Sequence, residues 1–164
     1  MVLNQLRQAR QEDFQDIHFV HQCAIRFACC GFYNDNVLKA WLANTSVDSY
    51  LKSMHTRELW VTEYQGKIQG FFQLNLQDGE LDALYVHPMY HSKGLGTAML
   101  HRAEKLTFDN ELSTLKLYAS LNSISFYRLN GYNKLRSCEL RLNSQVSVRG
   151  ELMCRNLYAD DFMD

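Results

Sequence analysis

One short segment of the chain has residue types suited to holding an anion. It combines two glycines with a lysine, and its residues are His91, Ser92, Lys93, Gly94, Leu95, Gly96 and Thr97. An apolar run precedes it and an amphipathic pattern follows it, which predicts a strand, this loop and then a helix. Glycine lets the backbone approach an anion, and the first amides of a helix are unpaired donors with partial positive charge. The segment fits a pyrophosphate-binding loop, although an ordinary strand-to-helix turn would need the same glycines.

The loop lacks the residues that define two common nucleotide-binding motifs. No Gly-Lys-Ser or Gly-Lys-Thr follows, as a P-loop requires, and the third glycine of the dinucleotide fingerprint is missing. The sequence therefore gives little support to ATP or NAD as the ligand.

Two carboxylates lie just before this loop, on a predicted strand over residues 80–86. Alternation along a strand would put Glu80 and Asp82 on one face, together with Leu84 and Val86. Carboxylates in such a position could take part in general acid–base chemistry. The alternative is that both are edge carboxylates that follow an Asp-Gly turn.

The hydrophobic pattern predicts the elements that position these residues. Strands are expected at 2–10, 58–64, 68–76, 80–86, 115–119, 132–142 and 146–157, and helices at 11–25, twice within 34–54, from 96 onward and at 122–129. Short Gly-containing turns join the three middle strands, so these strands should be antiparallel neighbours. The order predicts an α+β domain in which helices cover both faces of a mixed sheet.

The composition describes one folded domain over residues 1–164. Hydrophobic residues make up 46% of the chain, and no low-complexity tract or linker divides it. The 17 Lys and Arg nearly balance the 18 Asp and Glu, which argues against a nucleic-acid partner. Five cysteines without C-x-x-C spacing fit neither a disulfide framework nor a zinc site. No secretory signal or membrane-length apolar run is evident, so we expect a cytoplasmic protein that binds neither a metal nor a membrane.

Two motifs together resemble those of the GNAT N-acetyltransferase superfamily. The segment LYVHPMYHSKGLGTAML is similar to the family's acetyl-CoA pyrophosphate motif, and LYASLNSISFYRLNGY is similar to its following strand and helix. The likeness extends weakly over nearly the whole chain. It implies a layered α/β/α fold with a mostly antiparallel sheet of about six or seven strands. It also implies acetyl-CoA as co-substrate and an amine as acceptor.

The resemblance implies a set of cofactor contacts. In the family, a bulge splays the fourth strand from the next one, so the backbone of Leu84, Tyr85 and Val86 would face the thioester. The loop from His91 to Thr97 would hold the pyrophosphate, and Asn122 would be a further contact to coenzyme A. His91 departs from the family pattern, which usually has Gln or Arg at this position.

The resemblance also implies the acid and the base. Tyr127 stands where the family has a phenol near the sulfur, so it is the expected general acid, unless it only packs its helix onto the sheet. A subset of the family has its catalytic Glu at the position of Glu80. This ranks Glu80 above Asp82 as the base that accepts the amine's proton.

Other residues carry weaker signals. His18 and His21 have helical spacing but no partner ligands for a metal, and are interpreted as core or solvated histidines. Cys29 could face substrate, although a free cysteine is more often a small core residue.

Four aromatic residues fall in the helical region where the family builds its acceptor site. They are Phe27, Phe32, Tyr33 and Trp41, which form either an apolar wall of that site or part of the core.

The sequence thus predicts an acetyl-CoA-dependent N-acetyltransferase that acts on a primary amine, with a small molecule as the favoured acceptor. Two alternatives stay open: a non-catalytic coenzyme A-binding module, and an acetyltransferase acting on a protein amine. A homodimer is compatible with the resemblance, and no segment of the sequence identifies an interface.

Overall fold

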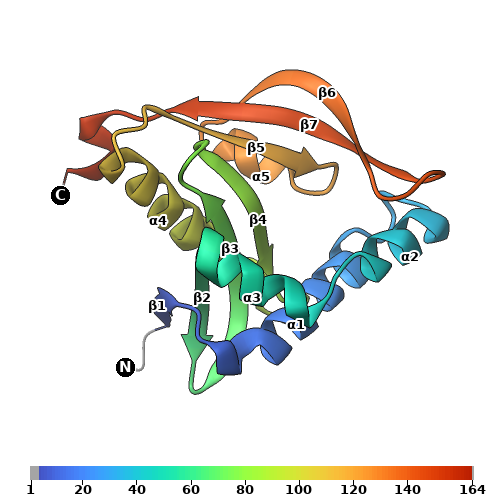
Figure 1. The fold of residues 1–164 in the computed structure, drawn as a ribbon. Helices are drawn as coiled ribbons and strands as arrows, with labels where there is room; N and C mark the ends of the chain where they lie inside the picture. Colours follow the sequence, from blue (N-terminus) through green and yellow to red (C-terminus); the bar gives the residue numbers. More distant parts are fainter. Residues whose placement is uncertain (1–3, 164) are drawn as a thin grey trace.

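A seven-stranded sheet forms the frame of the molecule (Figure 1). The computed structural model describes residues 4–163. The strands are β1 (Gln5–Gln8), β2 (Glu58–Tyr64), β3 (Lys67–Asn75), β4 (Glu80–Val86), β5 (Thr114–Ser120), β6 (Asn133–Arg141) and β7 (Ser147–Asn156). They lie in the order β1-β2-β3-β4-β5-β7-β6, and every neighbouring pair is antiparallel except β4 and β5.

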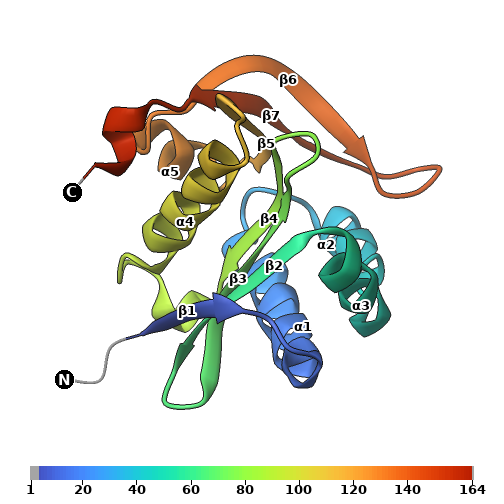
Figure 2. The same cartoon turned by 60° about the vertical axis from the view of Figure 1, so that its left-hand side comes forward.

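Helices cover both faces of this sheet (Figure 2). One face carries α4 (Leu95–Asp109) and α5 (Ile124–Leu129), and the other carries α1 (Phe14–Cys23), α2 (Asp35–Ala43) and α3 (Val47–Thr56). A π-helical turn at Ala24–Ala28 extends α1, and 3-10 turns lie at Gln11–Asp13, Pro88–Tyr90 and Ala159–Phe162. The predicted α+β fold with a mixed, mostly antiparallel sheet is confirmed.

Each face of the sheet has its own apolar core. On β3, Phe72 joins the core under α4, whereas Phe71 joins the core under α1 and α3, as strand alternation requires. Helix α4 buries Met99 and Ala103 against the sheet, which is the spacing of one helical face. On the opposite side, Ile17 of α1 is fully buried.

The two halves of the sheet separate between β4 and β5. The parallel pairing covers only Glu80 opposite Lys116 and Leu81 opposite Leu117. The other edge of β4 stays paired with β3 as far as Val86. From residue 82 to residue 86, one edge of β4 therefore faces a gap rather than a neighbouring strand.

A β-bulge interrupts β4 at the start of this gap. Gln73 of β3 lies opposite Ala83, but the next residue, Leu74, lies opposite Leu81. Asp82 is thus the extra residue, and an extra residue reverses the alternation of side chains on either side of it.

The bulge overturns one expectation about the acidic residues. Leu84 and Val86 pack into the core under α4, as does Leu81 before the bulge. Glu80 precedes Leu81 and points to the opposite face, and the Asp82 carboxylate accepts a hydrogen bond from Gln73 on that face. The expectation that Glu80 and Asp82 share a face with Leu84 and Val86 is therefore wrong.

The element boundaries differ from the prediction mainly at helix and strand ends. The first strand, expected over 2–10, covers Gln5–Gln8, while residues 2 and 3 lie outside the described part. The first helix begins at Phe14 after a 3-10 turn and ends in the π-helical turn at Ala24–Ala28.

A substitution at Gly150 tests the close approach of β5 and β7 beside the gap. A Cβ at position 150 would clash with the backbone carbonyl of Ala119, which no side-chain rotation can relieve. We expect Gly150→Ala to lower the free energy of unfolding by about 1–3 kcal/mol in urea denaturation. Ser137→Ala, on the exposed strand β6, is the control and should stay within about 0.5 kcal/mol. Equal midpoints for the two variants would contradict the contact.

Candidate functional site

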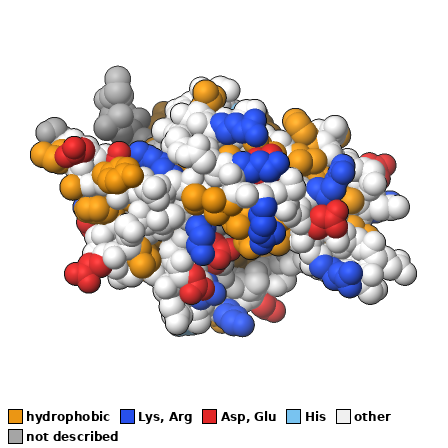
Figure 3. Space-filling model, turned by 90° about the horizontal axis from the view of Figure 1, so that it is seen from above, with side chains coloured by type: hydrophobic (Ala, Val, Ile, Leu, Met, Phe, Trp, Pro, Cys, Tyr) orange, Lys and Arg blue, Asp and Glu red, His pale blue; other side chains and the backbone are white. Residues whose placement is uncertain are grey.

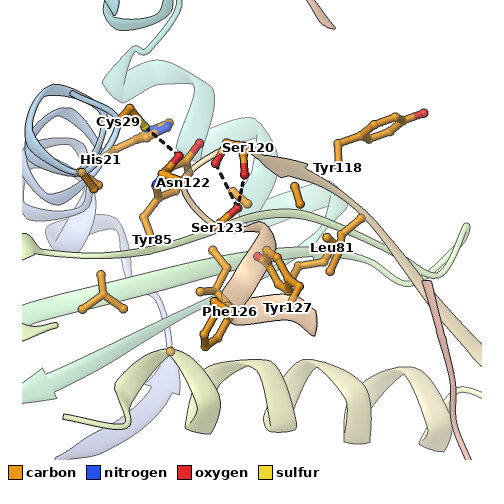
Figure 4. A pocket seen from close by; sticks show the side chains of 18 of the residues that line it. His21, Cys29, Leu81, Tyr85, Tyr118, Ser120, Asn122, Ser123, Phe126 and Tyr127 are labelled. Carbon is orange, nitrogen blue, oxygen red and sulfur yellow. Dashed lines mark hydrogen bonds between the residues drawn. The ribbon is translucent and has the colours of Figure 1, made fainter. Parts of the chain in front are cut away.

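A cavity of about 850 Å³ occupies the gap between β4 and β5. Its walls come from both faces of the sheet, with α4 and α5 on one side and α1, α2 and α3 on the other (Figure 4). The predicted site residues that line it are Glu80, Asp82, Leu84, Tyr85, Val86, His91, Ser92, Gly94, Leu95, Gly96, Thr97, Asn122 and Tyr127. The gap thus brings together residues that the sequence placed on several separate elements.

Lys93 is the predicted residue that does not line the cavity. Its amino group lies 5.9 Å from the centre of the Tyr90 ring. The lysine charge is therefore directed at an aromatic ring rather than at the cavity wall.

The loop before α4 presents free backbone donors to the cavity. Gly94 has φ of +80°, a left-handed conformation that glycine adopts without strain. The first turn of α4 has no side-chain cap, so its leading amides remain available to an anion. At Gly96, a Cβ would lie 3.2 Å from the Phe126 ring, which explains the second glycine by the close packing of α4 on α5.

His91 supports this loop from the end of β4. Its Nε2 lies 3.0 Å from the carbonyl oxygen of Val86, and because a carbonyl only accepts, the ring donates this hydrogen bond. The imidazole thus ties the loop to the strand on which the cavity opens.

Tyr127 of α5 is buried in the cavity wall, with 6% of its surface exposed. Its ring packs edge-on against Tyr132, with ring centres 5.7 Å apart. Burial alone raises the pKa of Tyr127 well above its usual range, and no hydrogen bond from another described residue contributes to this shift. The phenol is therefore a neutral donor at physiological pH.

Asn122 follows β5 and contacts a cysteine that also lines the cavity (Figure 4). Its Oδ1 accepts a hydrogen bond from the Cys29 thiol at 3.5 Å. Cys29 is 2% exposed, and burial raises its pKa to about 12. The structure agrees with both interpretations of Cys29, because the side chain is buried and also lines the cavity.

The two carboxylates of β4 differ in how they are engaged. The Asp82 carboxylate accepts hydrogen bonds from Arg57 at 3.1 Å and from Gln73 at 3.0 Å. Glu80 is partly buried; burial and the nearby Asp82 charge raise its pKa, whereas Lys116 lowers it. Glu80 is therefore the carboxylate that is freer to exchange a proton.

A histidine that sequence reasoning assigned to the core or to solvent belongs to the cavity wall. His21 Nδ1 lies 2.8 Å from the Tyr50 hydroxyl, and its ring centre lies 4.5 Å from that of Tyr85. Burial, with a smaller effect from the charge of His18, lowers the pKa of His21 to about 4. The sequence signal was its helical spacing, which could not show that Tyr50 would face it.

The four aromatic residues near α2 separate into two groups. Phe27 and Phe32 are 63% and 52% exposed and do not line the cavity. Trp41 lines it, and Tyr33 packs edge-on against Trp41 with ring centres 5.6 Å apart. Of these four residues, Trp41 therefore lines the cavity and Tyr33 packs against Trp41.

Metal-binding clusters, membrane-spanning helices and patches of one charge would indicate other kinds of site in the described residues. Within residues 4–163, no three His, Cys, Asp or Glu side chains gather as a metal site. No helix in the same range is long and apolar enough to cross a membrane. On the face drawn in Figure 3, Lys and Arg are mixed with Asp and Glu.

The comparison with known families decides where the chain belongs. Residues 5–132 match the family described as Acetyltransferase (GNAT) family. The chain belongs to the GNAT acetyltransferase family. The match covers β1 to α5, including the loop before α4 and the gap between β4 and β5, whereas β6 and β7 lie beyond it.

Solved GNAT structures share this fold. A GCN5-related N-acetyltransferase from Rhodopseudomonas palustris has a TM-score of 0.88 at 23% identity, covering 96% of this chain and 98% of that one. The PaiA N-acetyltransferase of Thermoplasma acidophilum, solved in complex with coenzyme A, has a TM-score of 0.79 at 20% identity, covering 94% and 99%. A ribosomal-protein-alanine N-acetyltransferase of Brucella melitensis gives 0.70 at 12%, covering 93% and 99%. No curated protein sequence matches this GNAT chain.

A titration of His21 tests the environment of the cavity. Burial disfavours the charged imidazolium, so its midpoint should lie at about 4 in the folded protein and return to about 6.5 in the unfolded chain. As the pH drops, the unfolded chain binds this proton at a higher pH than the folded protein does. The free energy of unfolding should therefore fall as the pH drops from about 6.5 towards 4. Long-range ¹H–¹⁵N spectra report the midpoint, and a folded value of about 6 or higher would contradict this environment.

Proposed function

We propose that this GNAT protein transfers the acetyl group of acetyl-CoA directly to a primary amine. The observation that carries the proposal is the cavity in the gap between β4 and β5. An anion-binding loop stands at its α4 side, and a buried phenol and a free carboxylate line its interior. These are the groups that acetyl transfer to an amine requires.

The residues present fit acetyl-CoA. The amides of the loop around Gly94 and of the first turn of α4 would hold the pyrophosphate. The unpaired edge of β4 at Leu84, Tyr85 and Val86 supplies backbone groups along the gap, and Asn122 supplies an amide side chain opposite. When bound there, acetyl-CoA provides an acetyl group activated as a thioester.

Two side chains, Glu80 and Tyr127, exchange protons in the proposed reaction. The acceptor arrives as an ammonium ion, and Glu80 takes one proton from it, directly or through water. The amine nitrogen forms the new bond to the acetyl carbon, the bond from that carbon to sulfur breaks, and Tyr127 gives its hydroxyl proton to the leaving thiolate. The second proton lost by the nitrogen restores the Tyr127 phenol. The products are an acetamide, coenzyme A as the free thiol, and one proton released.

The raised pKa of Tyr127 is compatible with its role as an acid. Burial that weakens the phenol as an acid also makes a thiolate at the same place a stronger base. Cys29 follows the same direction, because burial raises the pKa of its thiol to about 12 in the same cavity. Burial therefore raises the basicity of the Tyr127 phenolate and of a thiolate in this cavity alike, and the proton can pass from the phenol to the sulfur.

The direct test is the release of free coenzyme A thiol when the protein, acetyl-CoA and a panel of primary amines are mixed. The proposal expects release that depends on both the protein and the amine. Binding of acetyl-CoA without release on any amine would instead favour a non-catalytic coenzyme A-binding module.

Replacing the Tyr127 hydroxyl should separate catalysis from packing. Tyr127→Phe keeps the ring and removes the proton donor, so kcat should fall by about 100-fold with little change in melting temperature. The matched control is Tyr132→Phe, because Tyr132 donates to Glu104 and not into the cavity. That control should lose stability but keep its kcat. Unchanged turnover in Tyr127→Phe would remove Tyr127 from the mechanism.

The pH profile tests Glu80 as the base. The carboxylate accepts a proton only when ionised, so kcat/KM should fall as the pH drops through its raised pKa. Glu80→Gln should lower kcat/KM at pH 7 by about 10- to 100-fold and remove this acidic limb. Glu139→Gln, an exposed carboxylate on β6, is the control. An acidic limb that persists in Glu80→Gln would assign the base elsewhere.

A further inference from the structure

The side of the cavity lined by α1, α2 and α3 indicates which kind of amine is the acceptor. This inference rests on the proposed function. Two hydrogen-bonded bridges join the α2 region to the β6–β7 hairpin. The Tyr33 hydroxyl donates to the carbonyl of Arg149 at 2.5 Å and accepts from the amide of Leu121 at 2.8 Å. The Asn44 side chain donates to the carbonyl of Leu142 at 3.0 Å. Figure 1 shows α2 lying under the far end of this hairpin.

The bridges limit the size of the acceptor. Tyr33 precedes α2 and Asn44 follows it, so the helix is held to the hairpin at both ends. An amine at the end of a polypeptide must lead its following residues out through an open slot. Between α2 and the hairpin that slot is occupied by these contacts. The exposed rim on this face lies instead around Ser49, Asp82 and Tyr118, which suits a small molecule.

The wall inside the bridges is a continuous set of rings. The ring centre of Tyr85 lies 4.5 Å from that of His21 and 5.6 Å from that of Phe71, and Phe71 lies 6.0 Å from Tyr50. Trp41 adds an indole from α2. His21 is uncharged at neutral pH because burial disfavours its imidazolium form. Such a wall stabilises a flat, apolar body through dispersion and ring contacts.

The charges on this side match a single ammonium group. Asp82 is already engaged by Arg57 and Gln73, which leaves Glu80 as the carboxylate without a side-chain donor among the described residues. A monoamine can place its one cation at Glu80 and its apolar part against the rings. A polyamine would carry further cations toward Arg57.

We propose that the acceptor is a small primary monoamine carried on an aromatic body, of the arylalkylamine class. Its ring lies among Trp41, Tyr85 and His21, and its ammonium group faces Glu80. The α2 bridges close one exit for a polypeptide chain, which favours a small molecule over a protein N-terminus as the acceptor.

The test compares three acceptors by release of coenzyme A thiol: tyramine, spermidine and a hexapeptide that begins with alanine. We expect kcat/KM for tyramine to exceed the other two values by about tenfold or more. Higher values for spermidine or the peptide would overturn this inference and leave the proposed acetyltransferase intact. If neither these three acceptors nor any other amine of a broad panel causes release of coenzyme A thiol, this inference and the proposed function are both overturned.

Variants at Trp41 test the ring wall. Trp41→Ala should lower kcat/KM for tyramine by about tenfold or more, and Trp41→Phe, which keeps a ring, should recover most of it. Phe27→Ala, on the exposed side of the neighbouring helical turn, is the matched control and should leave kcat/KM unchanged. Melting temperature and acetyl-CoA affinity establish that each variant is folded. Equal kcat/KM in folded Trp41→Ala, Trp41→Phe and the parent protein would contradict the ring wall.

Discussion

β4 pairs with β5 at only two positions, Glu80 and Leu81, and the rest of the site depends on this incomplete pairing. A sheet normally satisfies each backbone donor and acceptor with its neighbour strand. Here the bulge at Asp82 ends the pairing, and the strands part while β3 holds β4 and β7 holds β5. The cavity, the exposed edge of β4 and the access from both faces of the sheet all follow from that separation.

The cavity also sets the charge state of the groups around it. Burial keeps the Tyr127 phenol, the Cys29 thiol and the His21 imidazole neutral, and it raises the pKa of Glu80. These pKa shifts share their largest cause, because a low-dielectric environment disfavours whichever form is charged. In the proposed reaction, the raised pKa makes the Glu80 carboxylate a stronger base toward the proton of the acceptor ammonium group.

Much of the fold could be predicted from the sequence because its signals are local. The alternation of β2, β3 and β4, the amphipathic stripe of α4 and the glycines at 94 and 96 each depend on neighbouring residues. All of the predicted site residues except Lys93 also line the cavity. Lys93 was assigned to the loop by position, but its side chain turns to Tyr90.

The parts that could not be predicted depend on contacts between distant residues. The bulge is defined by the register of β4 against β3, so a single strand's pattern could not show that Glu80 leaves the face of Leu84. The pair of His21 and Tyr50 joins α1 to α3 across 29 positions. The Tyr33 bridge to Arg149 spans 116 positions, and no local pattern encodes it.

Hydrogen exchange with and without acetyl-CoA tests the central claim most directly, which is that the gap beside β4 receives the cofactor. The account predicts that saturating acetyl-CoA slows exchange at those amides of Leu84 to Val86 that point away from β3 into the gap. It predicts the same for the amides of Gly94 to Thr97, which precede the first helical hydrogen bonds of α4. Amides of the edge strand β1 serve as the internal reference. Slowed exchange elsewhere, with these two segments unchanged, would contradict the account.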